Sequence, residues 1–348
     1  MLECVTLGSW PSMQLTLVLP NMLEAALDAA DAPALARLLS TAPPPVVEPD
    51  GPLAIACAGV GIAKQNDWPV APWLARAAGT DPGSRYWLCA EPVTLEVGRD
   101  EVRLACIVID LDTDESAALL LSLRAHFAPD GLEFVERSAG RWWVTLAEPQ
   151  RLETSPPSAA LGKPLIEHLP RGADAPRWRR WQSEMQMLLF EHPVNHARGS
   201  SGRSPVNYVW VWGGGTLRAT DPDAPAAAVF TEAPLLRDLA RAFGKSAAKA
   251  PGSFAAFRAA SPAASALVWL DDLKAPDLQK QLTAFDFEWA APMERALDKQ
   301  ELDLTLVIAG SGPALSFTPR ATGTIKRLRR HWSTPPNLSA LLAAQADT

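Results

Sequence analysis

Trp178–Gly215 reads WRRWQSEMQMLLFEHPVNHARGSSGRSPVNYVWVWGGG, and this stretch decides the fold. It holds four of the thirteen tryptophans beside glutamate, glutamine, histidine, asparagine and arginine side chains. The pattern predicts a helix, a polar loop and a strand that ends in three glycines. Several polar groups therefore reach one end of a sheet, which is where α/β proteins usually hold their binding sites. The candidate site comprises Glu184, Gln186, His192, Asn195, Arg198, Asn207, Gly213, Gly214 and Gly215.

The predicted helix begins near Asp174 and ends before Pro193, which cannot continue it. At about 100° per residue, six residues share one face: Trp178, Trp181, Met185, Leu188, Leu189 and His192. Because Met187 and Phe190 lie elsewhere on its surface, the helix is predicted to be apolar nearly all round and therefore buried.

Glu184 lies on this helix beside Trp181 and Met185. A lone buried carboxylate is too costly to leave without a hydrogen bond or an opposite charge. We therefore expect Glu184 to be buried and held by Arg198 or by the loop 195–207.

Short apolar runs predict the strands of a sheet, and helical patterns separate them. Such alternation indicates an α/β fold with a mostly parallel sheet flanked by helices. The strands are expected at Gln14–Leu19, Val206–Trp212, Ala266–Leu270 and Leu302–Ala309, and the helices at 23–39, 234–243 and 289–297.

Residues 102–146 show a different pattern. They predict a strand, a helix opened by the capping box of Asp112 and Glu115, and a hairpin. We therefore expect a main α/β domain formed by residues 1–85 and 171–348, with an inserted α+β lobe over residues 86–170.

The composition excludes several classes of protein. Lys and Arg number 32 against 39 Asp and Glu, so the net charge of −7 offers no basic surface for duplex nucleic acid.

The four cysteines lack CxxC spacing, so we expect reduced cysteines in a cytosolic protein and neither disulfides nor structural zinc. Residues 4–23 carry no charge, but no basic residue precedes Arg37 and polar residues interrupt the run. Neither an export signal nor a membrane span is expected, and we predict a cytoplasmic protein.

Two patterns in the candidate site have structural explanations. Gly213–Gly215 would let an anion approach backbone N–H groups, but the glycines match no nucleotide-binding motif, and a tight strand exit is favoured. His192 and His196 stand four apart, yet Pro193 breaks the helix that a zinc-binding pair requires. We expect His192 and Asn195 to fix the helix end and the loop.

Asp271 and Asp272 follow a predicted buried strand. Carboxylates in that position bind metals in some enzymes and cap the next helix in many proteins. Without a nearby histidine, capping is favoured and the metal site remains a weak alternative. No serine or cysteine stands in the context of a catalytic nucleophile, and no cofactor is expected.

Five ordered blocks of sequence resemble bacterial regulatory proteins of the RpfE type. In that family the first block reads as an Asp-Pro-Val-His type sequence, where this chain has Glu91 and Thr94. The resemblance implies a regulatory role with a protein partner. Genes of the family often lie beside a gene for a single-strand-specific exonuclease, which implies, as a further alternative, that this protein is a partner of such an enzyme. The blocks are YWLCAEPVTL (86–95), RWWVTL (141–146), LPRGAD (169–174), EMQMLLFEHPVN (184–195) and VNYVWVWGGG (206–215).

The layout is more remotely similar to the archaeal type of cofactor-independent phosphoglycerate mutase, a member of the alkaline phosphatase superfamily. That resemblance implies metal-binding Asp and His residues at strand ends and a serine nucleophile. Here the first strand is followed by Asn21, the last by Gly310 and Ser311, and Ala275 stands where a histidine would follow Asp271. We therefore expect a non-catalytic regulatory or scaffolding protein. The alternative is a mutase-like or other phosphoryl-transfer enzyme with a site rebuilt around Glu184, Gln186, Asn195, Arg198 and Asn207.

Overall fold

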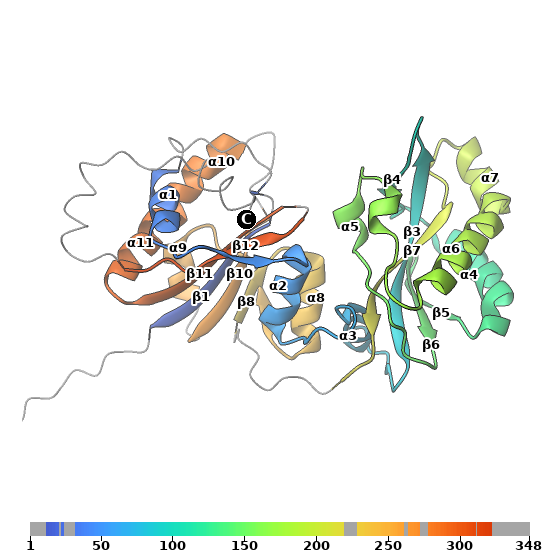
Figure 1. Cartoon of the computed structure of the whole chain (residues 1–348), viewed down its shortest axis with the longest axis horizontal. Helices are drawn as coiled ribbons and strands as arrows, with labels where there is room; N and C mark the ends of the chain where they lie inside the picture. Colours follow the sequence, from blue (N-terminus) through green and yellow to red (C-terminus); the bar gives the residue numbers. More distant parts are fainter. Residues whose placement is uncertain are drawn as a thin grey trace, which may run out of the picture. The chain divides into compact units, whose positions relative to one another are not determined.

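The computed structural model describes residues 12–20, 22–23, 32–218, 228–260, 264–271, 278–310 and 312–321. The chain divides into two compact units (Figure 1). The first unit combines Met1–Gly61 with Asp223–Thr348, and the second is the intervening segment Ile62–Pro222. The second unit is thus an insertion in the sequence of the first.

A mostly parallel sheet forms the centre of the first unit. Its strands in the described residues are β1 (Met13–Leu19), β2 (Val46–Glu48), β8 (Ala228–Thr231), β9 (Ser246–Ala248), β10 (Ser265–Trp269), β11 (Leu302–Ala309) and β12 (Ala314–Phe317). They follow the order β2-β12-β11-β1-β10-β8-β9. β1 pairs in parallel with β10 and β11, and β8 and β9 continue the parallel part, whereas β12 and β2 are antiparallel.

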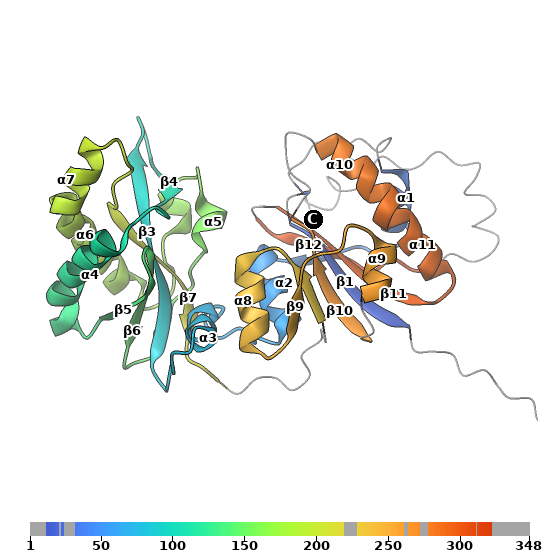
Figure 2. The ribbon, with the colours of Figure 1, turned by 180° about the vertical axis from the view of Figure 1, so that it is seen from behind.

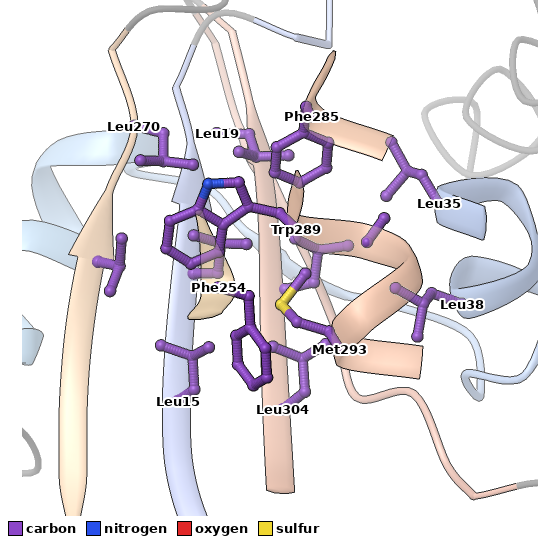
Figure 3. Packing of buried hydrophobic residues seen from close by; sticks show 14 of the residues in the cluster. Leu15, Leu19, Leu35, Leu38, Phe254, Leu270, Phe285, Trp289, Met293 and Leu304 are labelled. Carbon is purple, nitrogen blue, oxygen red and sulfur yellow. The ribbon is translucent and has the colours of Figure 1, made fainter. Parts of the chain in front are cut away.

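Helices cover both faces of this sheet (Figures 1 and 2). They are α1 (Pro33–Ser40), α2 (Gly51–Val60), α8 (Pro234–Ala242), α9 (Phe254–Ala260), α10 (Leu278–Phe285) and α11 (Ala291–Asp298). α1, α9, α10 and α11 lie on one face, and α2 and α8 lie on the other. Figure 3 shows the core under the first group, where Leu15 of β1 and Leu304 of β11 meet Phe254, Trp289 and Met293.

A π-helical turn, Asp286–Ala290, joins α10 to α11. Asp286 is buried, and its carboxylate accepts hydrogen bonds from the backbone N–H groups of Ala34 (3.1 Å) and Leu35 (2.8 Å). Burial raises the pKa of Asp286, while these two hydrogen bonds oppose the rise. The carboxylate therefore caps the first turn of α1, whose own residue before the helix, Ala32, has no side chain able to do so.

The second unit is built on an antiparallel sheet. Its strands are β3 (Tyr86–Val97), β4 (Val102–Ile107), β5 (Glu133–Ser138), β6 (Arg141–Leu146) and β7 (Tyr208–Gly215). The long strand β3 pairs with β4, β6 and β7. The helices are α3 (Val70–Ala77), α4 (Thr113–Phe127), α5 (Pro157–Ala160), α6 (Ala175–Phe190) and α7 (Pro193–Ser200), with 3-10 turns at Ala128–Asp130 and Leu165–His168. α4 and α6 pack side by side on one face of the sheet and bury its apolar side chains (Figures 1 and 2).

The predicted α/β class, with a mostly parallel sheet flanked by helices, is confirmed. The capping box is also present, because Asp112 accepts from the Glu115 N–H and Glu115 accepts from the Asp112 N–H. The boundaries of the inserted lobe differ from the predicted 86–170. Strand β7 pairs along β3 and α6 shares its core, so residues 171–215 belong to the inserted unit and not to the main sheet.

Other elements also differ from the sequence prediction. Of the predicted helix 23–39 the structure shows α1 from Pro33, and residues 24–31 lie outside the described residues. The segment that follows Pro193 forms α7, where a loop is predicted. None of the helices that the structure describes combines the length and the hydropathy that a bilayer span requires.

Candidate functional site

Helix α6 lies on the sheet of the second unit with one apolar face, as its pattern predicts. Trp178, Trp181, Met185 and Leu189 are buried in the core shared with β3, β6 and β7. The expectation that the helix is buried all round is wrong, because Met187 is 67% exposed and Phe190 is 71% exposed. These two apolar side chains occupy the outer face of a helix that is covered on one side.

Glu184 is on the flank of α6 and not in the core. Its carboxylate forms ion pairs with Arg180 (3.1 Å) on the same helix and with His126 (3.5 Å) on α4, and its side chain is 27% exposed. The prediction that Glu184 is buried and held by Arg198 or by the loop 195–207 is therefore wrong. Gln186, two residues further along α6, is exposed.

Asn195 and Asn207 bind backbone groups. Asn195 donates to the carbonyls of Leu189 and Val206 (both 2.7 Å) and accepts from the Val206 N–H (2.8 Å). Asn207 pairs with Leu95 through its side-chain amide, accepting at 2.7 Å and donating at 2.8 Å. Both amides are therefore used to fix the entry into β7, which is the structural role that the sequence predicts for Asn195.

His192 occupies the position before α7 and caps it. Its Nδ1 accepts from the Val194 N–H (3.3 Å), and its Nε2 lies 3.1 Å from the Ser122 hydroxyl of α4. Burial lowers the pKa of His192, which favours the neutral imidazole that this capping bond needs. His192 thus fixes the start of α7, whereas the sequence predicts that it fixes the end of the preceding helix.

Arg198 is the most deeply buried charge of the candidate set, with no exposed side-chain surface. Its guanidinium donates to the Glu115 carboxylate (2.7 Å), the Asp110 carboxylate (2.5 Å) and the Ser204 carbonyl (2.8 Å). Glu115 also binds Arg203 at 2.6 Å. The hydrogen bond and charge of Arg198 lower the pKa of the exposed Asp110 carboxyl. All three guanidinium nitrogens donate hydrogen bonds, so Arg198 joins α7 to the start of α4 and its charge is balanced within the protein.

The three glycines lie at the far end of β7 from Asn207. Six residues of extended chain span roughly 20 Å, so the glycines and the polar residues before β7 do not form one site. Each glycine contacts a neighbour closely: an added Cβ at Gly214 would lie 2.1 Å from the Tyr86 Oη, and one at Gly215 would lie 2.3 Å from Pro69. Gly213 has a φ of +70°. Close packing and a β-bulge therefore account for the run, because the register of β3 and β7 shifts between Trp87 and Cys89, opposite these glycines. The predicted tight strand exit is wrong, since β7 continues through Gly215.

A buried carboxylate that sequence reasoning missed lies beside these glycines. Asp67, 4% exposed, accepts hydrogen bonds from the Thr154 hydroxyl, the Trp68 N–H (2.8 Å) and the Gly214 N–H (3.3 Å). Burial raises the pKa of Asp67 to about 6, although these hydrogen bonds and the charge of Lys64 oppose the rise. The segment around Asp67 carries no motif. The sequence therefore gives no sign that Asp67 contacts Gly214, which lies 147 positions later in the chain.

The carboxyl ends of the parallel strands are the other place where an α/β protein would hold a ligand. At this edge the Asp271 carboxylate accepts from the Trp269 indole (3.1 Å), and Glu232 pairs with Lys249 (2.9 Å). Gly310 follows β11. Asn21, Asp272 and Ser311 lie outside the described residues. Within the described residues no three His, Cys, Asp or Glu side chains come together in a metal-binding arrangement.

Comparison with known proteins shows partial similarity to phosphoglycerate mutases. Over 61 residues the chain is 46% identical to the 2,3-bisphosphoglycerate-independent phosphoglycerate mutase of Methanothrix thermoacetophila, covering 18% of this chain and 16% of that protein. Over 156 residues it is 26% identical to the enzyme of the same name from Methanosarcina mazei, covering 39% of each. The chain thus matches well under half the length of these curated relatives. No model of a protein family matches it.

Two solved structures are similar to the chain at low identity. The cofactor-independent phosphoglycerate mutase of Thermoplasma acidophilum superimposes with a TM-score of 0.43 and 17% identity, over 88% of this chain and 90% of that one. A protein of Pyrococcus horikoshii gives a TM-score of 0.41 and 15% identity, over 89% and 88% of the two chains.

Proposed function

We propose that this chain is a non-catalytic regulatory or scaffolding protein derived from a phosphoglycerate-mutase-like α/β fold. The partial identity to archaeal phosphoglycerate mutases supports the ancestry. The resemblance to RpfE-type regulatory proteins supports the regulatory role. A protein partner and a cytoplasmic location are parts of the same proposal.

One observation carries the non-catalytic half of the proposal. Phosphoryl transfer assisted by two metals needs about six or seven ligands and a positioned nucleophile, and the strand ends of this sheet are where they would belong. β1 is followed by Pro20 and Asn21, and β11 by Gly310. The Asp271 carboxylate is already bonded to an indole. Asp271 and Asp272 alone would hold a hard cation only weakly, through water.

The rebuilt enzyme site considered from the sequence has little support in the geometry. The hydrogen-bonding groups of Asn195 and Asn207 bind backbone, and Arg198 binds two carboxylates and a carbonyl. Glu184 is elsewhere, on the flank of α6. A mutase-like activity remains the alternative because the relatives are named phosphoglycerate mutases. Such an activity would use the carboxyl edge of the parallel sheet.

The test is conversion of 3-phosphoglycerate by the full-length protein with Mn²⁺, Mg²⁺, Co²⁺ or Zn²⁺. The Methanosarcina mazei enzyme serves as the positive control. A double variant, Asp271→Asn with Asp272→Asn, removes the carboxylates after β10. Glu301→Gln makes the same kind of charge change just before β11, at the opposite edge of the sheet.

We expect no turnover and no stoichiometric metal in the purified protein. Turnover that the double variant abolishes and Glu301→Gln retains would overturn the non-catalytic proposal and establish the mutase alternative.

A further inference from the structure

A polar recess opens on the sheet of the first unit, on the face opposite the core in Figure 3. Its volume is about 460 Å³, within the range of sites for small molecules. Polar residues from the amino-terminal halves of β1 and β11 and from the segment after β12 line it: Gln14, Thr16, Asp303, Thr305, Thr318 and Arg320. The recess therefore lies away from the carboxyl edge considered above, and the inference does not depend on the proposed function.

The strand register places these side chains in two rows. Gln14 of β1 pairs with Asp303 of β11, and Thr16 pairs with Thr305. Thr16 and Thr305 therefore stand side by side on strands about 4.8 Å apart, and so do Gln14 and Asp303. Thr318 and Arg320 join them in the lining of the recess from the segment that follows β12, whose last residue, Phe317, pairs with Leu306.

These residue types are unexpected at their positions. Central strands of a parallel sheet are covered on both faces and usually carry apolar side chains. The carboxyl halves of the same strands follow that rule, since Val18 and Val307 on this face are buried. Within the described part of the chain, no side-chain hydrogen bond involves Thr16, Thr305 or Thr318. Their hydroxyls are therefore available to a ligand.

The chemistry of the recess favours a neutral ligand rich in hydroxyl groups. Asp303 and Arg320 bring opposite charges to the lining of the recess, so neither a cation nor an anion is strongly favoured. Threonine hydroxyls and the Gln14 amide both donate and accept hydrogen bonds, as the hydroxyls of a sugar or polyol require. We propose that this recess binds a neutral sugar or polyol.

Saturation-transfer NMR on the full-length protein tests the proposal with D-glucose, D-mannose, maltose and myo-inositol, with acetate and glycine as charged comparators that carry observable C–H protons. The double variant Thr16→Val, Thr305→Val removes two hydroxyls but keeps β-branched residues that suit strands. Thr283→Val, at an exposed position of α10 on the opposite face of the sheet, is the matched control. Thermal melts followed by circular dichroism verify that both variants fold.

We expect saturation transfer to at least one of the four neutral compounds and none to acetate or glycine. The double variant should raise the dissociation constant about tenfold or more, because each lost neutral hydrogen bond contributes about 1 kcal/mol. Thr283→Val should leave it unchanged. No transfer to any neutral compound, binding that the double variant retains, or binding of acetate instead would each overturn the proposal.

Discussion

Asp67→Asn is the substitution that most directly tests the physical chemistry of the second unit. Asp67 is almost fully buried beside Thr154 and Gly214, and its pKa rises from 3.8 to about 6 because burial disfavours the charged carboxylate. A group whose pKa is higher in the folded than in the unfolded state stabilises the fold fully at low pH. That contribution is lost as the pH rises through the folded-state pKa of about 6.

The size of the effect follows from the two pKa values. One pKa unit corresponds to about 1.4 kcal/mol, so the rise of roughly two units costs about 3 kcal/mol once Asp67 is fully ionised. Between pH 5 and pH 7.5, titration of this single group should lower the free energy of unfolding by about 1.4 kcal/mol. Asparagine cannot ionise, and the variant should lose this part of the pH dependence.

Urea unfolding followed by tryptophan fluorescence at pH 5, 6 and 7.5 measures the effect, because most of the thirteen tryptophans lie in the second unit. The absolute stability of Asp67→Asn is not the test, since the amide nitrogen must face one backbone N–H that the carboxylate now accepts from. The test is the difference between pH 5 and pH 7.5. Glu153→Gln, an exposed change of the same charge next to Thr154, is the control.

Equal pH dependence in the wild type and Asp67→Asn, within about 0.3 kcal/mol, would refute the reasoning. It would mean that water reaches Asp67 and keeps its pKa near the ordinary value. A Glu153→Gln variant that lost the same pH dependence would refute it too, because the effect would then come from general surface charge.

Three further predictions concern the second unit. Arg198→Met should lower the free energy of unfolding by about 3 to 5 kcal/mol in urea titrations, because it leaves the Glu115 carboxylate without its buried partner; a loss under about 1 kcal/mol would contradict this. Gly214→Ala should be severely destabilising in thermal melts, because the new methyl group meets the Tyr86 hydroxyl. Adding Tyr86→Phe removes that hydroxyl and should restore part of the lost stability. Equal melting temperatures of Gly214→Ala with and without Tyr86→Phe would refute the clash. Glu184→Ala should cost less than about 1 kcal/mol, since its ion pairs are at the surface, and a loss above about 2 kcal/mol would point to a buried role.

The features that the sequence predicts correctly are encoded locally. The apolar runs of β1, β10 and β11 and the reciprocal bonds of Asp112 and Glu115 depend on residues that are neighbours in the chain. The buried face of α6 also follows from its own periodicity. Each of these features can be recognised from its own stretch of sequence, without knowing which element packs against it.

The features that it misses depend on distant partners. β7 is apolar on both faces, which suits the centre of either sheet, and only its pairing with β3 assigns it to the second unit. Met187 and Phe190 are apolar yet exposed, so composition alone overstates the burial of α6. Arg198 was predicted as a site residue, but its partner Glu115 lies 83 positions earlier, and that contact makes it structural.

Gln65 and Thr216 join the two ends of the inserted second unit by hydrogen bonds. They lie near the two points where the chain enters and leaves the unit, and Gln65 donates to the Thr216 carbonyl (2.7 Å) and accepts from the Thr216 N–H (3.1 Å). The unit therefore closes its own ends with its own hydrogen bonds, and a host chain needs only two adjacent attachment points in a surface loop to carry it. A segment built this way is suited to transfer between genes as a single insertion, because the fold of the host protein need not change to accept it.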